Sequence, residues 1–140
     1  MNRKKLNERM YEAIETKSAL AIQMLLEQGV EFNSEICTEP TLKVLLIDAV
    51  YRGHANVVKS IADTVKNVNY KDNKELSPLH MAVVRRNEKI VRMLIDAGAD
   101  VNMKGFQDMT PLQLSIMLEN SKSARIFLDA IENKNSIQQS

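Results

Sequence analysis

The feature that most restricts how this chain can fold is a self-similarity with a period of 33 residues. The segment SPLH at residues 77–80 reappears 33 residues later as TPLQ, and a shift back by 33 places Ala82 over Ala49. A shift back by 69 residues, two periods plus three, brings Gly98 over Gly29. The chain therefore contains four related units, with a three-residue insertion between the first and the second. A repeat of this length is typical of solenoids, in which each unit contacts only its neighbours.

Each unit reads as two short helices followed by an extended arm. In the third unit, Ser77 is a good N-cap and Pro78 suits the first helical turn. A break at Asn87 separates two helices, whose apolar residues share one face each: Leu79, Ala82 and Val83, then Ile90, Val91, Leu94 and Ile95. Gly98 suits the end of the second helix, and we expect Gly105 to let the arm turn back. Helices this short are marginal alone, so we expect the units to stack and bury one another's apolar faces.

The two ends of such a row meet water on one side and should differ from the interior units. The first unit lacks the Ser/Thr-Pro start and carries Glu12, Glu15 and Lys17 on its first helix. The last unit has Ser123-Ala124 where the third has Ile90-Val91. We interpret this replacement as an adaptation of the last unit to its position at the end.

Composition narrows the class of protein further. Of the 140 residues, 44% are apolar but only 4% are aromatic, so the core must be filled by aliphatic side chains, which suits helix packing. The net charge of +1 argues against a dedicated nucleic-acid binder. The single cysteine excludes an internal disulfide. The basic segment at the start is followed by no apolar stretch, so it does not have the pattern of a secretory signal. We therefore expect a cytoplasmic protein with no signal peptide and no membrane segment.

In these residues the sequence resembles the ankyrin-repeat family. The match covers roughly residues 8–132 and is closest in the third unit, through SPLH, Ala82, Ile90-Val91, Leu94-Ile95 and the closing GADVN. It implies an all-α solenoid of stacked helix-turn-helix units with extended or β-hairpin arms. We expect a basic N-terminal tail at residues 1–7, an ankyrin-repeat domain at 8–132 and a polar C-terminal tail at 133–140. The expected repeats lie at about 8–37, 38–72, 73–105 and 106–132.

The second unit departs from the family pattern in two places. Thr64-Val65 stands where the family has Ala-Gly, so we expect the second helix of this unit to run on or to end irregularly. Pro40 precedes Thr41, which reverses the usual order. We expect Thr38 to cap instead, which gives a longer first helix.

Side chains that could carry chemistry have structural explanations in this pattern. The resemblance implies that His80 hydrogen-bonds backbone between neighbouring units, and His54 lies at a helix break. Cys37 has Glu35 and Glu39 as neighbours, which disfavour a reactive thiolate. The glycines are scattered singly, so no phosphate-binding loop exists, and the eight methionines suit a core. We expect no enzymatic activity, no cofactor and no metal.

The resemblance also maps a binding surface onto the chain, because first helices and arm tips line a concave groove in ankyrin arrays. The expected partner-binding residues are Glu15, Tyr51, Arg52, Lys74, Leu76, Val84, Arg85, Phe106, Gln107, Met109, Met117 and Leu118. Several are apolar at positions that the fold does not need to bury, and an exposed apolar strip rimmed by charge often marks a protein-binding surface. The alternative for Met117 and Leu118 is that they lie under the C-terminal tail.

We interpret the chain as a monomeric, non-enzymatic module that binds another protein through this groove as an inhibitor, an immunity-type factor or an adaptor. Two alternatives stay open. One is a nucleic-acid-associated accessory protein, for which Arg85-Arg86 and Arg52 form a small basic spot that acidic residues interrupt. The other is a small enzyme that uses Cys37 and His54.

Overall fold

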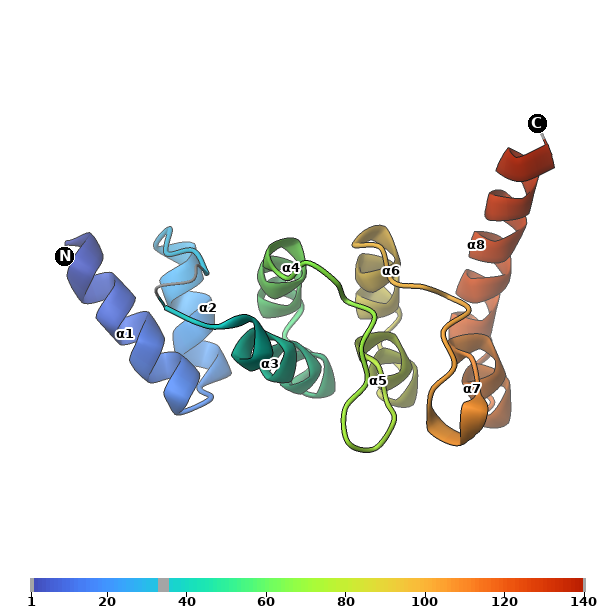
Figure 1. Cartoon of the computed structure of the whole chain (residues 1–140), viewed down its shortest axis with the longest axis horizontal. Coiled ribbons are helices and arrows are strands. Elements are labelled where there is room, and N and C mark those ends of the chain that lie inside the picture. The colour runs from blue at the N-terminus through green and yellow to red at the C-terminus, as the bar shows by residue number, and fades with distance from the viewer. Residues whose placement is uncertain (1, 33–35, 140) are drawn as a thin grey trace. The chain divides into compact units, whose positions relative to one another are not determined.

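The computed structural model describes residues 2–32 and 36–139, and these residues form four helical hairpins (Figure 1). The hairpins are α1 (Arg3–Glu15) with α2 (Ala19–Glu27), α3 (Glu39–Arg52) with α4 (Ala55–Thr64), α5 (Pro78–Val84) with α6 (Glu88–Asp96), and α7 (Pro111–Met117) with α8 (Ser121–Gln139). A single 3₁₀ turn, η1 (Phe106–Asp108), lies in the arm before α7. The described residues contain no strand, so the all-α class is confirmed.

The hairpins group into two compact units, Met1–Lys66 and Asn67–Ser140. In the first unit α2 packs against α4, and in the second α5 packs against α7 and α6 against α8. First helices therefore contact first helices in the second unit, and second helices contact second helices. This is the stacking that the repeat predicted.

The turn between the two helices is built in the same way in all four hairpins. Its backbone is left-handed at Lys17, Gly53, Arg86 and Glu119, with φ between 53° and 78°. The next residue is the N-cap of the second helix. In three of the hairpins its side chain accepts a hydrogen bond from a backbone N–H two or three residues into that helix, and these caps are Ser18, Asn87 and Asn120. Each cap satisfies an N–H group that the helix itself leaves without a partner.

The predicted apolar faces form the core. In the third hairpin, Ala82 and Val83 of α5 and Ile90, Val91 and Leu94 of α6 are fully buried. In the first unit, side chains at the corresponding faces are equally buried; they include Met10, Leu46, Val58 and Ile61. A fully buried aliphatic side chain contributes about 1.5–3 kcal/mol, far more than the propensity of a two-turn helix.

The expected helix boundaries of the third hairpin are confirmed. Ser77 caps α5 by accepting from the His80 N–H at 3.2 Å, and Pro78 takes the first helical position. Helix α6 ends at Asp96, and Gly98 follows with a φ of 98°. This left-handed backbone is the conformation that favours glycine.

The two expected departures of the second hairpin are also present. Thr38 is the N-cap of α3, which is the longer first helix that the sequence predicted, although its hydroxyl lies 3.1 Å from the Thr41 hydroxyl and caps no backbone group. Helix α4 ends at Thr64, and Val65 leaves it in an extended conformation, so this helix ends without a left-handed residue.

The helices extend into both segments that the sequence pattern assigned to tails. Asn2 accepts from the Lys5 N–H at 2.9 Å and caps α1, so residues 3–7 belong to a helix. Helix α8 has 19 residues and runs well beyond the end of α7 (Figure 1). Residues 133–139 are therefore helical as well.

The interpretation of Ser123-Ala124 as an adaptation to the end of the row is wrong for Ser123. Ser123 is fully buried, and its hydroxyl oxygen has no hydrogen-bond partner among the described residues. The residue fills space inside the unit and carries a polar group into it. A buried hydroxyl without a partner costs about 1–3 kcal/mol.

Ser123→Ala should therefore stabilise the protein by about 1 kcal/mol, because it removes the unpaired hydroxyl and leaves a residue with high helix propensity. Urea unfolding monitored by circular dichroism measures the change. Ser115→Ala is the matched control: Ser115 is also fully buried, but its hydroxyl donates to the Leu112 carbonyl at 2.6 Å. The control should gain nothing, and equal shifts in both variants would contradict the assignment.

Candidate partner-binding surface

Two arms of the second unit end in tight turns that side chains and backbone hold closed. In the arm before α5, the Asp72 carboxylate accepts from the Lys74 and Leu76 N–H groups at 2.8 and 3.0 Å, and the Asp72 N–H donates to the Leu76 carbonyl. In the arm before α7, the Gly105 N–H donates to the Met109 carbonyl at 2.9 Å. The tips are therefore ordered turns, as an Asp at the start of a turn favours.

His80 ties the second arm to the first helix of the preceding hairpin. Its Nε2 lies 2.9 Å from the Met109 carbonyl oxygen, and its Nδ1 lies 2.6 Å from the Ser77 hydroxyl. A carbonyl only accepts, so Nε2 carries the proton and donates, while Nδ1 accepts from Ser77. The backbone contact between neighbouring repeats that the resemblance implied for His80 is present.

Gly105 is required for a different reason from the one the sequence indicated. A Cβ atom at this position would lie 2.6 Å from the Glu75 carbonyl oxygen and 2.9 Å from the His80 ring. Its φ is −140°, outside the left-handed region. Glycine therefore allows the two arms to approach each other, and the turn itself does not demand it.

Burial keeps His80 neutral. The side chain is fully buried, and this loss of solvation lowers the pKa of His80 from its ordinary value of 6.5. The hydrogen bond to Met109 opposes this effect, and the Lys71 cation adds to it. The neutral ring is the form that can donate to Met109 while it accepts from Ser77.

Sequence reasoning missed Asn69, a second anchor of the arms. Its side chain donates to the Gly98 carbonyl at 3.2 Å and accepts from the Asp100 N–H at 2.7 Å. The repeat contained a signal for this anchor, because Asn69 aligns with Asn102 at the end of the next repeat. This side chain joins the bases of the two arms, as His80 joins their outer parts.

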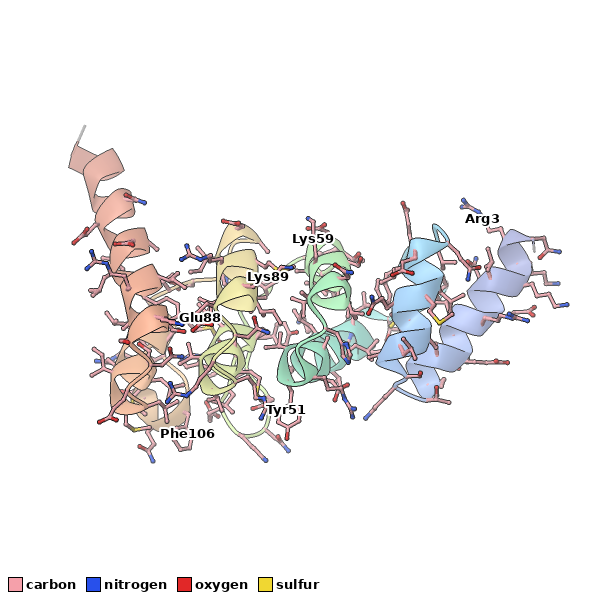
Figure 2. The ribbon with its side chains drawn as sticks, turned by 180° about the vertical axis from the view of Figure 1, so that it is seen from behind. Arg3, Tyr51, Lys59, Glu88, Lys89 and Phe106 are labelled. Atoms are coloured by element: carbon pink, nitrogen blue, oxygen red, sulfur yellow. The ribbon has the colours of Figure 1, made fainter. Side chains whose placement is uncertain are left out.

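The predicted binding residues of the second unit fall into two clusters. The arm-tip cluster comprises Lys74, Leu76, Phe106, Gln107 and Met109. Phe106 is exposed and points away from the helices of its unit, whereas Leu76 and Met109 are half-buried (Figure 2). Lys74 and Gln107 are exposed polar residues beside them. The cluster thus presents an aromatic ring with polar neighbours on an anchored support.

The helix-end cluster comprises Val84, Arg85, Met117 and Leu118. Val84 and Met117 are the last residues of the packed helices α5 and α7, and 41% and 50% of their surfaces are exposed. The alternative that the C-terminal segment covers Met117 is therefore not supported. The Arg86 guanidinium donates to the Leu118 carbonyl and ties the two helix ends together, a contact that the sequence analysis missed.

The two clusters lie toward opposite ends of the first helices. The arm enters α5 at its N-terminus, and Val84 ends that helix. Seven residues at about 1.5 Å each separate the clusters by roughly 10 Å along the axis. A partner that touches both must therefore span the length of a first helix.

Three predicted binding residues belong to the first unit. Glu15 ends α1, and Tyr51-Arg52 end α3, so all three occupy helix ends like those of the second unit. About half of the Tyr51 surface is exposed, and its ring projects from the end of α3 (Figure 2). Arg52 forms an ion pair with Asp48 at 3.1 Å.

The residues considered for catalysis show no activated arrangement. Cys37 is buried, its thiol faces the Thr38 carbonyl at 3.6 Å, and burial together with Glu15 raises its pKa. Glu39, expected to act on this thiol, accepts from the Lys66 N–H instead, and Glu35 lies outside the described residues. A thiol of this kind is a poor nucleophile at neutral pH.

No group of three or more His, Cys, Asp or Glu side chains in residues 2–32 and 36–139 is placed to hold a metal ion. Within the same part of the chain, no helix combines the length and apolar character needed to cross a membrane.

Stacked helical hairpins with anchored arms define a helical-repeat protein. The model of the family described as ankyrin repeats, in three copies, matches residues 10–105 and 46–138. The chain therefore belongs to the ankyrin-repeat family, whose members generally serve as protein–protein interaction modules and are typically non-enzymatic. A comparison with curated proteins finds no match.

The buried His80 makes a prediction about pH. The pKa of His80 in the folded chain lies below the unfolded value of 6.5. At a pH between the two values, His80 is therefore protonated in the unfolded chain and neutral in the folded chain. The stability contributed by neutral His80 is complete above pH 6.5 and is lost as pH falls from there through the folded pKa, with a slope of up to about 1.4 kcal/mol per pH unit. His80→Gln should remove this part of the slope, measured by urea unfolding between neutral and mildly acidic pH.

The chain supplies a matched control for this experiment. His54, the other histidine, is half-buried at the start of α4, and its side chain caps no backbone group. His54→Gln should leave the pH slope of the wild type in place. Identical slopes in the wild type and in His80→Gln would show that His80 does not carry the effect.

Proposed function

We propose that this chain binds a partner protein through the arm-tip and helix-end clusters and performs no catalytic step itself. The observation that carries the proposal is the exposure of three large apolar side chains, Val84, Phe106 and Met117, on supports that are themselves held in place. A partner that covers these side chains removes their apolar surface from water, and this removal favours binding. Tyr51 of the first unit adds a fourth, amphipathic side chain of the type enriched at binding hot spots.

The magnitudes suit a moderate complex. Val84, Phe106 and Met117 are 37–50% exposed, so covering them contributes roughly 2–4 kcal/mol in total, about 40% of the value for full burial. The rest of the roughly 8 kcal/mol of a micromolar complex, and the cost of association, must come from other contacts such as Tyr51. Polar neighbours such as Lys74, Arg85 and Gln107 then contribute orientation and selectivity more than affinity.

Because residues 2–32 and 36–139 offer an exposed surface and no activated catalytic group, the proposed mode of action is occupation or masking of the partner. An inhibitor, an immunity-type factor and an adaptor all act in this way. We place this activity inside the cell, because the reducing environment there keeps a free cysteine such as Cys37 reduced.

The nucleic-acid alternative loses support from the contacts of its basic spot. Arg86 donates to the Leu118 carbonyl, and Arg52 pairs with Asp48. Arg86 and Arg52 are thus engaged within their own units. We therefore propose a protein partner and no second function.

Combined substitution of Tyr51, Arg85, Phe106 and Leu118 by alanine should abolish capture of the partner, with an affinity loss of at least about tenfold for the purified complex. The measurement is affinity purification with tagged wild type and variant, followed by mass spectrometry and then by calorimetry on any protein that the variant loses.

The control for this variant lies on α6, at Lys89 and Arg92, which are exposed side chains outside both clusters. Their double alanine variant should capture the same protein as the wild type. An unchanged affinity in the fourfold variant would show that the assigned surface is not the binding site.

A further inference from the structure

The fourth hairpin presents an apolar face that no described residue covers. Ile116 is 63% exposed, whereas Val50 and Val83, at the same position of the second and third repeats, are fully buried. Leu112 is likewise half-buried where Leu79 of the third repeat is buried. In the third hairpin these positions lie on α5 and α6, which pack against α7 and α8 of the following repeat. In the fourth hairpin they form what we call the outgoing face: Leu112, Ile116, Ala124 and Leu128.

The first hairpin has a complementary hollow. A groove of about 580 Å³ is lined by residues of α1, α2 and the turn between them. Its apolar lining, which we call the incoming face, consists of Ala13, Ala21, Met24 and Leu25. Ala13 and Ala21 occupy the repeat positions of Ser115 and Ser123, the small residues that are fully buried in the fourth hairpin. The groove therefore lies at repeat positions that are fully buried in the fourth hairpin.

Charges at the two faces also match. In the third hairpin, Arg86 reaches the carbonyl of Leu118 in the next repeat. Glu119 holds the position of Arg86 in the fourth hairpin, and Thr16 holds the position of Leu118 in the first. A copy stacked in the same register would bring the exposed Glu119 carboxylate to Thr16, whose exposed neighbours are Lys17 and Glu15. The Lys17 ammonium attracts Glu119, and the Glu15 carboxylate opposes this attraction.

We propose that the outgoing face of one molecule docks on the incoming face of a second copy and so continues the stack of repeats head to tail. A second copy is the occupant that the observations favour, because this one chain carries both halves of the stacking interface that already joins α5 to α7 and α6 to α8. A head-to-tail contact is heterologous and does not stop at a dimer.

This contact is weaker than an internal one, because two bonds of the internal interface are missing. Glu119 holds the position of Arg86 and cannot donate to a carbonyl as Arg86 does. Gln113 holds the position of His80, but its side chain accepts from the Thr110 N–H at 2.9 Å and so turns back on its own helix. The fourth hairpin therefore offers no counterpart of the His80 bond to the next arm. The monomer expected from the sequence then describes dilute solution, and association sets in as concentration rises.

Sedimentation velocity of the full chain over about two orders of magnitude in concentration tests the proposal. The weight-average mass of the wild type should rise past that of a dimer. Ile116→Glu and Met24→Glu should each hold the protein at monomer mass, because each blocks one face. An equimolar mixture of the two variants should form a dimer and nothing larger, since each molecule then has one usable face.

Val44→Glu is the control, because it places the same charge on an exposed apolar side chain of α3, outside both faces and both clusters. It should associate like the wild type. Leu128→Glu repeats the test on α8 if circular dichroism shows that Ile116→Glu does not fold. A wild type that stays monomeric throughout, or a Met24→Glu variant that still dimerises, would overturn the proposal; the first result leaves the faces to another protein, and the second indicates a symmetric contact.

The charge pair gives an independent test. Lys17→Glu and Glu119→Lys should each weaken association by about tenfold, and the double variant should recover the wild-type curve. Failure of the double variant to recover would contradict the proposed register.

Discussion

Burial between neighbouring hairpins is the interaction on which the rest of this structure depends. Helices α5 and α7 have seven residues each, about two turns, and such helices do not persist alone in water. Apolar contact with adjacent helices stabilises them. Val83 is fully buried in this way, whereas Ile116, at the same repeat position of the fourth hairpin, is largely exposed. Caps and turns refine each hairpin, but their contributions of about 1 kcal/mol each are secondary to the burial.

The residues of the candidate binding surface are held in position by the packing of the hairpins. The arms contain no strand in the part of the chain that is described, and the second one is held by His80, Asn69 and the close approach at Gly105. His80 and Asn69 each join one repeat to the next, and Gly105 lets the second arm approach the first. The exposed side chains at the arm tips and helix ends are therefore positioned by contacts between repeats, so a loss of stacking would also disorganise the surface. Functional loops on a rigid scaffold commonly have this dependence.

The repeat register made the helices, their apolar faces and most of their ends predictable. Each depends on a local rule, as at Ser77, Pro78 and Gly98, where capping or backbone preference acts within a few residues. The crowding at Gly105 was not predictable in this way, because it arises from Glu75 and His80, which are distant in the sequence. The burial of Ser123 was not predictable either, because its polar side chain indicated an exposed position. The division of the candidate site into two clusters also needed coordinates, since it depends on which end of α5 each residue occupies.

The central claim, that neighbouring hairpins stabilise one another by burying equivalent positions, is tested most directly by one matched pair of variants. Val83 and Ile116 occupy the same repeat position, one fully buried and one 63% exposed. Urea unfolding should show that Val83→Ala costs about 2 kcal/mol and that Ile116→Ala in dilute solution costs less than about 0.5 kcal/mol. Equal losses at the two positions would contradict the account, because the burial of Val83 by the next hairpin would then contribute nothing.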